Sequence, residues 1–276
     1  DIYGKVLIAS SFEKSKKLFP ATAATSAACG DIDKDGYTDF LVNHQVYLND
    51  GTGGFRASGA PLRLQVPSSQ ARGVDLADYN GDGLLDIAQA VFNPGTDNIE
   101  IITYQNNGEG MFRENYQRIT VEDGHANSLH WVDWNNDGHL DIATSRKVFV
   151  GNGMGHWSPC STQLPETADY SSRPVDLNGD SMLDWGWYVR NEDETFSEIP
   201  LEGGLDISVV RGYAFGDYDG DGYPDLAISV KELEERPDGS KKLNPCTRIY
   251  RNAITHFELM YNSSAGATEK PALTWA

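Results

Sequence analysis

The chain has 276 residues, 23% of them charged, and a formal net charge of −19 at pH 7. The acidic excess argues against nucleic-acid binding, which needs a basic surface, and no apolar run is long enough to span a bilayer. A chain of this length suits one large repeat domain, so we expect residues 1–276 to form a single domain.

Five segments of nine residues share one spacing: 31–39, 78–86, 133–141, 176–184 and 217–225. Each has Asp at positions 1, 5 and 9 and Asp or Asn at position 3, and all but one have glycine at position 6. Side-chain oxygens at these places, with the main-chain carbonyl of position 7, can surround one hard cation, and the glycine permits the sharp turn. The expected calcium ligands are Asp31, Asp33, Asp35, Tyr37 and Asp39; Asp78, Asn80, Asp82, Leu84 and Asp86; Asp133, Asn135, Asp137, His139 and Asp141; Asp176, Asn178, Asp180, Met182 and Asp184; and Asp217, Asp219, Asp221, Tyr223 and Asp225.

About five calcium sites are therefore predicted, and they account for much of the acidity. The loops hold 17 of the 41 acidic residues, and five calcium ions would bring the net charge from −19 to −9. The site at 176–184 is predicted to be the weakest. Ser181 stands where the other loops have glycine, and Asn178 supplies no charge.

The EF-hand loop shares the acidic positions and the glycine, but it needs a bidentate glutamate at position 12. This chain has Val42, Gln89, Thr144, Trp187 and Ile228 there. The segments that follow the loops, such as 85–92 and 225–230, are short, apolar and β-favouring. The loops are therefore predicted to lie between strands.

The loops recur with steps of 47, 55, 43 and 41 residues, a period that indicates a solenoid, propeller or array. Glycine-rich hairpin turns are expected at 49–55, 106–112 and 151–157. Four short strands per period are the content of one propeller blade. The fold class is therefore all-β, a β-propeller of four-stranded blades with about six blades' worth of sequence, in a six- or seven-bladed ring.

The segment 215–226, Phe-Gly-Asp-Tyr-Asp-Gly-Asp-Gly-Tyr-Pro-Asp-Leu, and its counterparts resemble the FG-GAP/VCBS repeat of integrin α-type β-propellers over nearly the whole chain. The resemblance implies that each loop joins the first two strands of a blade and binds calcium. It also implies a recognition role.

The two ends resemble parts of one further blade. Residues 1–8 align with 141–150, and residues 272–276 resemble 128–132, so we expect the termini to split a sixth calcium loop. Either the ring closes within the chain or the chain is one part of a longer protein, paired with other strands. The charged segment 231–245 is expected to be a solvated loop.

The sequence has no Gly-x-Ser-x-Gly, His-Glu-x-x-His or Cys-x-x-Cys motif, so catalysis is not indicated and no catalytic residue is assigned. Trp131, Trp134, Trp185 and Trp187 are candidates for stacking on a sugar, although packing between blades is the commoner role of such residues. Cys29, Cys160 and Cys246 favour one disulfide and a free thiol over three reduced thiols.

Calcium dependence and the glycosylation sequon at Asn262 point to an extracellular or cell-surface location. The leading hypothesis is a non-catalytic, calcium-stabilised module that recognises a glycan or an extracellular protein, or that belongs to a larger surface assembly. The alternative is a carbohydrate-active enzyme that resembles the polysaccharide-lyase propellers.

Overall fold

The computed structural model describes residues 26–58, 70–108, 110–122, 128–165, 174–204, 210–235 and 241–262. In these ranges twenty strands form five antiparallel sheets, which we call blades 1 to 5, and no helix is long and apolar enough to cross a membrane. The strands are β1 (Ala27–Gly30), β2 (Asp39–Val42), β3 (Gln45–Asn49) and β4 (Phe55–Ala57) in blade 1; β5 (Ala71–Ala77), β6 (Asp86–Asn93), β7 (Asn98–Asn106) and β8 (Phe112–Val121) in blade 2; β9 (Leu129–Val132), β10 (Asp141–Thr144), β11 (Val148–Gly151) and β12 (Trp157–Pro159) in blade 3; β13 (Pro174–Val175), β14 (Asp184–Trp185), β15 (Tyr188–Arg190) and β16 (Phe196–Glu198) in blade 4; and β17 (Val210–Gly216), β18 (Asp225–Glu235), β19 (Lys241–Asn252) and β20 (Phe257–Asn262) in blade 5.

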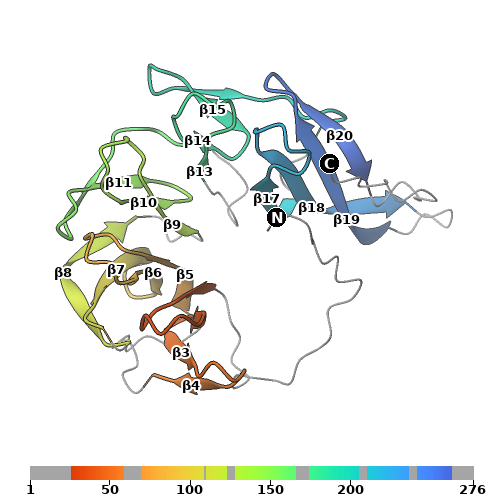
Figure 1. Ribbon diagram of the computed structural model, residues 1–276. Coiled ribbons are helices and arrows are strands. Elements are labelled where there is room, and N and C mark those ends of the chain that lie inside the picture. The colour runs from red at the N-terminus through yellow and green to blue at the C-terminus, as the bar shows by residue number, and fades with distance from the viewer. Residues whose placement is uncertain are drawn as a thin grey trace, which may run out of the picture.

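Each blade is a meander of four strands that are consecutive in the sequence, and the blades follow one another round an arc in chain order (Figure 1). The first strand of a blade lies toward the inside of the arc and the last toward the outside, most clearly in blade 2, between β5 and β8. β5 lies beside β1 on one side and β9 on the other. This radial arrangement is that of a β-propeller, as the sequence period predicts.

The five acidic segments, which we call loops 1 to 5, connect the first and second strands of their blades. In every case the aspartate at position 9 is the first residue of the second strand. The predicted turns at 49–55, 106–112 and 151–157 connect the third and fourth strands. In a four-stranded meander these two kinds of connection emerge at the same end of the blade, so the loops and the turns share one face of the molecule.

The hydrophobic core consists of layers between successive blades. One buried cluster joins blades 1 and 2, a second joins blades 2 and 3, a third joins blades 3 and 4, and a fourth joins blades 4 and 5. Alternation of buried residues along β2 and β3 directs Leu41, Val46 and Leu48 to the face that packs on blade 2. In β6 six successive residues are buried, because blade 2 is covered on both faces.

Two of the expectations from the sequence are wrong, and a third concerns residues outside the described ranges. The described residues form five blades rather than six or seven, because the sequence assigned to the sixth lies at 1–8 and 272–276, outside the described part. The segment 231–245 is mostly strand, since β18 and β19 continue into it and pair Lys231 with Pro245 and Glu235 with Lys241. The predicted split loop at the termini also falls outside the described residues.

Candidate metal centre

All five loops share one hydrogen-bonded scaffold. One oxygen of the position 1 aspartate accepts from the N–H of position 6 at 2.6–3.0 Å. One oxygen of the position 5 aspartate accepts from the N–H of position 7 at 2.8–2.9 Å. Position 6 has a positive φ of 83–92° at its four glycines. The shared contacts fold every loop into the same tight turn.

Ser181 takes the conformation expected from its place at position 6. Its φ is 70°, in the left-handed region that glycine adopts without strain. Its N–H still donates to Asp176 at 2.9 Å. Loop 4 therefore keeps the common scaffold at the cost of backbone strain. Whether it holds calcium most weakly stays a prediction.

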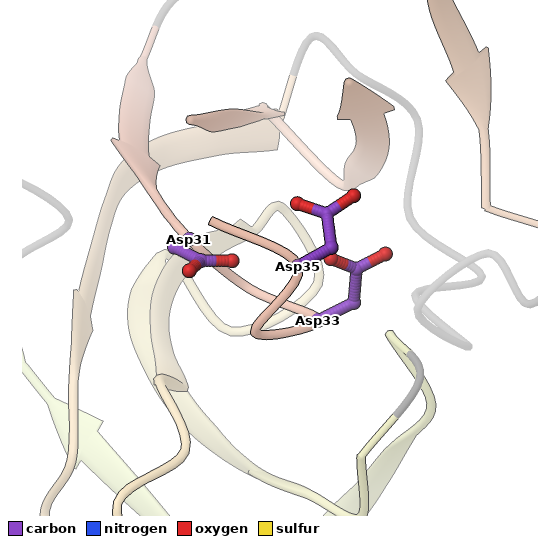
Figure 2. Close-up of side chains that lie close together, drawn as sticks. All are labelled: Asp31, Asp33 and Asp35. Atoms are coloured by element: carbon purple, nitrogen blue, oxygen red, sulfur yellow. The ribbon is translucent and has the colours of Figure 1, made fainter. Parts of the chain in front are cut away.

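Loops 1 and 5 bring three carboxylates together. In loop 1 an oxygen from each of Asp31, Asp33 and Asp35 lies within 4.8 Å of the others, and in loop 5 the same holds for Asp217, Asp219 and Asp225. Figure 2 shows the loop 1 side chains gathered round the turn. The two loops are those with aspartate rather than asparagine at position 3.

Loop 1 also contains carboxylate oxygens that lack a partner. Oδ1 of Asp31 and Oδ1 of Asp33 are buried and accept no hydrogen bond within the described part of the chain. Burial, and next the negative charges of Asp39 and Asp35, raise the pKa of Asp33. Buried, unpaired carboxylate oxygens that repel one another fit a site for a hard cation such as calcium, which would satisfy them all.

Loops 2, 3 and 4 differ because asparagine occupies position 3. The side-chain N–H of Asn80 donates to Asp82 at 3.0 Å, and Asn135 and Asn178 make the same bond to Asp137 and Asp180 at 3.0 and 2.9 Å. One carboxylate oxygen at position 5 is thus already engaged within the loop. These three loops offer less unpaired negative charge than loops 1 and 5.

The aspartate at position 9 has a structural role that the spacing did not reveal. It is at most 2% exposed in every loop. One of its oxygens accepts from the N–H of position 2 at 2.7–3.3 Å. The other accepts from the N–H of the last residue of the third strand at 2.6–2.8 Å. The carboxylate therefore ties the loop to the third strand, besides any ligand role.

Burial raises the pKa of four of these carboxylates, those of Asp86, Asp141, Asp184 and Asp225. It raises the pKa of Asp86 to about 7 and that of Asp184 to about 6, while the backbone N–H donors act in the opposite direction. The other carboxylates of each loop add a smaller upward effect. Without a cation, therefore, Asp86 and Asp184 keep their protons up to a higher pH than an ordinary aspartate does.

Position 7 was predicted to contribute its main-chain carbonyl. In each loop the N–H of this residue is fixed by the position 5 aspartate, and its carbonyl role stays a prediction. The side chains of Tyr37 and His139 lie over glycines of their own third-to-fourth-strand turns, where a Cβ at Gly51 or Gly153 would meet the ring at 2.5–2.6 Å. A side chain at either glycine would therefore displace the neighbouring ring.

The four tryptophans proposed to stack on sugars lie in the core. Trp131 is 9% exposed and stacks on Tyr79 with ring centroids 5.7 Å apart. Trp134 meets Trp185 at 6.3 Å, and Trp187 lies in the cluster between blades 4 and 5. Each is less than a tenth exposed, so none presents an open face to a sugar. The structure places them in blade packing, the alternative that the sequence left open.

The cysteine expectation is also corrected. Cys29, Cys160 and Cys246 are all free thiols, because they lie in different blades: Cys29 in β1, Cys160 after β12 and Cys246 in β19. Asn262 is the last residue of β20, and its glycosylation stays a prediction.

The inner strands carry one pair that could suggest acid–base chemistry. His130 Nδ1 lies 3.9 Å from Asp75 Oδ2. However, Asp75 already accepts hydrogen bonds from the backbone N–H groups of Leu76 and Trp131, both at 3.0 Å. Asp75 therefore bridges β5 to β9, and this arrangement alone does not indicate catalysis.

Comparison with protein families gives two matches at these loops. Residues 214–232, which contain loop 5, match the FG-GAP repeat model. Residues 43–88, which contain loop 2, match the model of an FG-GAP-like repeat. The chain contains FG-GAP repeats. The propeller described above is therefore an FG-GAP-repeat β-propeller.

Comparison with whole proteins gives more distant similarities. The T-cell immunomodulatory protein of Rattus norvegicus is 26% identical over 228 residues, 73% of this chain, and the chain spans 37% of that relative's length. The Vibrio cholerae biofilm matrix protein Bap1 has a TM-score of 0.43 and 16% identity, over 86% of this chain and 38% of that one. A Bifidobacterium bifidum protein provisionally assigned as an exo-β-1,3-galactanase has a TM-score of 0.41 and 12% identity, over 80% of this chain and 82% of that one.

Proposed function

We propose that this FG-GAP-repeat propeller is a calcium-stabilised, non-catalytic recognition module that acts outside the cell. The observation that carries the calcium part is the set of buried, unpartnered oxygens of Asp31 and Asp33, which lie with Asp35 within 4.8 Å. When bound, calcium would neutralise carboxylates that the fold holds together. Loops 1 and 5, with three aspartates each at positions 1, 3 and 5, would bind it most tightly.

The recognition part is supported by the face that carries the loops. Tyr37 in loop 1 is 48% exposed. Met111 and Met154 in the turns of blades 2 and 3 are 52% and 87% exposed, and Ile254 in the turn of blade 5 is 44% exposed. Apolar side chains gathered on one part of a surface are typical of interaction sites, and these four all belong to loops and turns on the same face. A protein or a glycan is the proposed partner of this face.

Calcium binding is tested by titration calorimetry and by thermal unfolding with and without a chelator. We expect saturable binding, a large drop in the melting temperature on chelation and full recovery on adding calcium back. The variant Asp219→Ala should lose one tight site, whereas Glu198→Ala, an exposed residue outside the loops, should bind as the parent does. An unchanged melting curve in excess chelator would contradict the proposal.

The partner is tested separately, with calcium present throughout. The protein is applied to a glycan array, and every glycan that binds is then incubated with it and analysed for cleavage. Binding that survives incubation with no new product supports a recognition module. Cleavage products would instead establish the alternative, a carbohydrate-active enzyme. Should no glycan bind, an extracellular protein becomes the expected partner, to be sought by crosslinking through lysines introduced on the loop face.

A further inference from the structure

The last residue of the third strand connects two neighbouring loops. In blade 2 the backbone N–H of Asn106 donates to Asp86 of loop 2 at 2.8 Å. Its side-chain Nδ2 donates across the blade boundary to the carbonyl of Ile32, position 2 of loop 1, at 2.9 Å. Asn106 is only 1% exposed. A single buried residue thus holds the ninth carboxylate of one loop and the backbone of the preceding loop.

The same connection recurs in blades 5 and 4. Asn252 donates through its backbone to Asp225 of loop 5 and through Nδ2 to the carbonyl of Leu177 in loop 4, both at 2.8 Å. In blade 4 the residue that makes both contacts is an arginine. The backbone N–H of Arg190 donates to Asp184 of loop 4 at 2.8 Å. Its guanidinium reaches the carbonyl of Trp134 in loop 3 at 2.9 Å.

A second set of contacts joins some of the same loops. At position 4 of loop 3, the side chain of Asn136 donates to the carbonyl of Ser181, position 6 of loop 4, at 2.7 Å. Lys34, at position 4 of loop 1, extends to Gly83, at position 6 of loop 2. The Nζ atom of Lys34 would lie 2.8 Å from a Cβ built on Gly83. Position 4 of loop 2 is Gly81, which has no side chain to extend.

Within the described residues, neither of these two kinds of contact joins loop 2 to loop 3 across the boundary between blades 2 and 3. The last residue of the third strand of blade 3 is Gly151. Its N–H donates to Asp141 at 2.6 Å, but glycine has no side chain that could reach loop 2. No larger residue fits, because a Cβ there would lie 2.3 Å from the carbonyl of Leu140 and 2.9 Å from the indole nitrogen of Trp157. Trp157 instead donates to Leu140 within its own blade and packs on Tyr79 of loop 2 at 5.3 Å.

We propose that the five loops are conformationally coupled in two groups, loops 1 and 2 and loops 3, 4 and 5, and that Gly151 separates the groups. Asn106, Arg190 and Asn252 are the positioning residues that transmit a change in one loop to the next. If the loops bind calcium, as the proposed function has it, occupancy would be cooperative within a group and independent between groups. The coupling itself does not depend on the ion.

Hydrogen–deuterium exchange of the loop peptides tests the grouping. Gly138→Ala strains loop 3 without a clash, because φ is +83° and no atom lies within 4 Å of the new Cβ. Exchange in loop 3 should accelerate about five-fold. Peptide 176–184 should accelerate as well, while peptide 78–86 should stay unchanged, although loops 2 and 4 both flank loop 3. Equal acceleration of loops 2 and 4, or of neither, would overturn the proposal.

A double-variant comparison tests the role of Asn106. Gly36→Ala strains loop 1 at a φ of +91° with no atom within 4 Å, and loop 2 should respond. That response should shrink in an Asn106→Ala background, where only the Lys34 contact still joins the two loops, and it should keep its full size in Asn49→Ala. Asn49 bonds to its own blade through the Thr38 carbonyl at 3.0 Å, and no bond to another blade is found for it in the described ranges. A response of equal size in Asn106→Ala and Asn49→Ala would contradict the positioning role.

If Asn106→Ala fails to fold, the pair Gly222→Ala and Asn252→Ala reports on loops 5 and 4 in the same way. Gly222 also has a positive φ, +92°, and open space around it. Because the comparison is made between loops of one variant, its outcome does not depend on whether calcium binds. Failure of the coupling and failure of the calcium proposal are therefore distinguishable.

Discussion

At the scale of single residues, Ser181 is the clearest case of strain within the repeat. Its φ of 70° lies where the other four loops have glycine. We expect Ser181→Gly to raise the free energy of unfolding by roughly 1 kcal/mol in urea titrations, because glycine removes the clash of Cβ with the backbone. The same change should tighten calcium binding at loop 4.

The matched control is the reverse substitution in loop 3. Gly138→Ser introduces serine at a φ of 83° in an otherwise complete loop, and it should destabilise the protein by a similar amount. If Ser181→Gly proved neutral while Gly138→Ser was costly, the serine in loop 4 would have to be compensated by its own contacts.

The buried ninth carboxylates predict an unusual pH dependence in the calcium-free protein. Folding raises the pKa of Asp86 to about 7 and that of Asp184 to about 6, so the folded state binds more protons than the unfolded chain between about pH 4 and 7. Stability is therefore lost as pH rises through the folded values. In chelator we expect the melting temperature to rise when pH is lowered from 7.5 to 5.5.

With calcium present the direction should reverse, because protons then compete with the cation for the same oxygens. Differential scanning calorimetry at matched ionic strength measures both cases. A melting temperature in chelator that fell steadily from pH 7.5 to 5.5 would show that protonation of Asp86 and Asp184 does not govern the metal-free protein.

Residue spacing in the sequence was enough to locate every loop and to identify the aspartates that gather in loops 1 and 5. It did not show that the aspartate at position 9 is fully buried and bonded to the end of the third strand. That bond joins residues 6 to 27 apart, as for Asp184 with Arg190 and Asp225 with Asn252, and depends on how a strand folds back. A short pattern carries no such information.

At the scale of elements, the residue at position 2 of loops 1 to 4 is buried in the core between two successive blades. Trp134 is 1% exposed, packs against Trp185 and lies under the guanidinium of Arg190 at 4.3 Å. Trp134→Ala should lower the free energy of unfolding by about 3–5 kcal/mol, because a large buried ring would leave a cavity between blades 3 and 4. Chemical denaturation with calcium present measures the loss.

The control is Met154→Ala. This side chain is 87% exposed in the turn of the adjacent hairpin, so its removal should change stability by less than about 0.5 kcal/mol. A small effect for Trp134→Ala would mean that blades 3 and 4 can close over the vacated space.

Among the elements, the strands and turns were predictable where apolar and glycine-rich segments alternate with the loops. The turns at 49–55 and 106–112 are in the expected places. The segment 231–245 was misread, because its charges and prolines are typical of a loop, whereas β18 extends into it as far as Glu235 and β19 begins in it at Lys241, and the two strands pair with each other. Cross-strand pairing overrides local composition here.

At the scale of the whole molecule, the net charge of −19 makes the calcium-free protein sensitive to salt. Raising the ionic strength from about 10 mM to about 1 M shortens the screening length from roughly 30 Å to roughly 3 Å. In chelator the melting temperature should therefore rise markedly with sodium chloride. In calcium the rise should be smaller, since cations then neutralise the loop carboxylates. Equal salt effects in both conditions would argue against calcium in the loops.

The strand order within the blades has a consequence for how the chain folds. Each of the five sheets in the described residues consists of four successive strands, so none of these sheets needs a distant segment to complete its hydrogen bonding. Pairing between neighbours in sequence closes only short loops and is fast. During synthesis at about 5–20 residues per second, a blade could form within seconds of leaving the ribosome. Its exposed flank would then be a template on which the next blade docks.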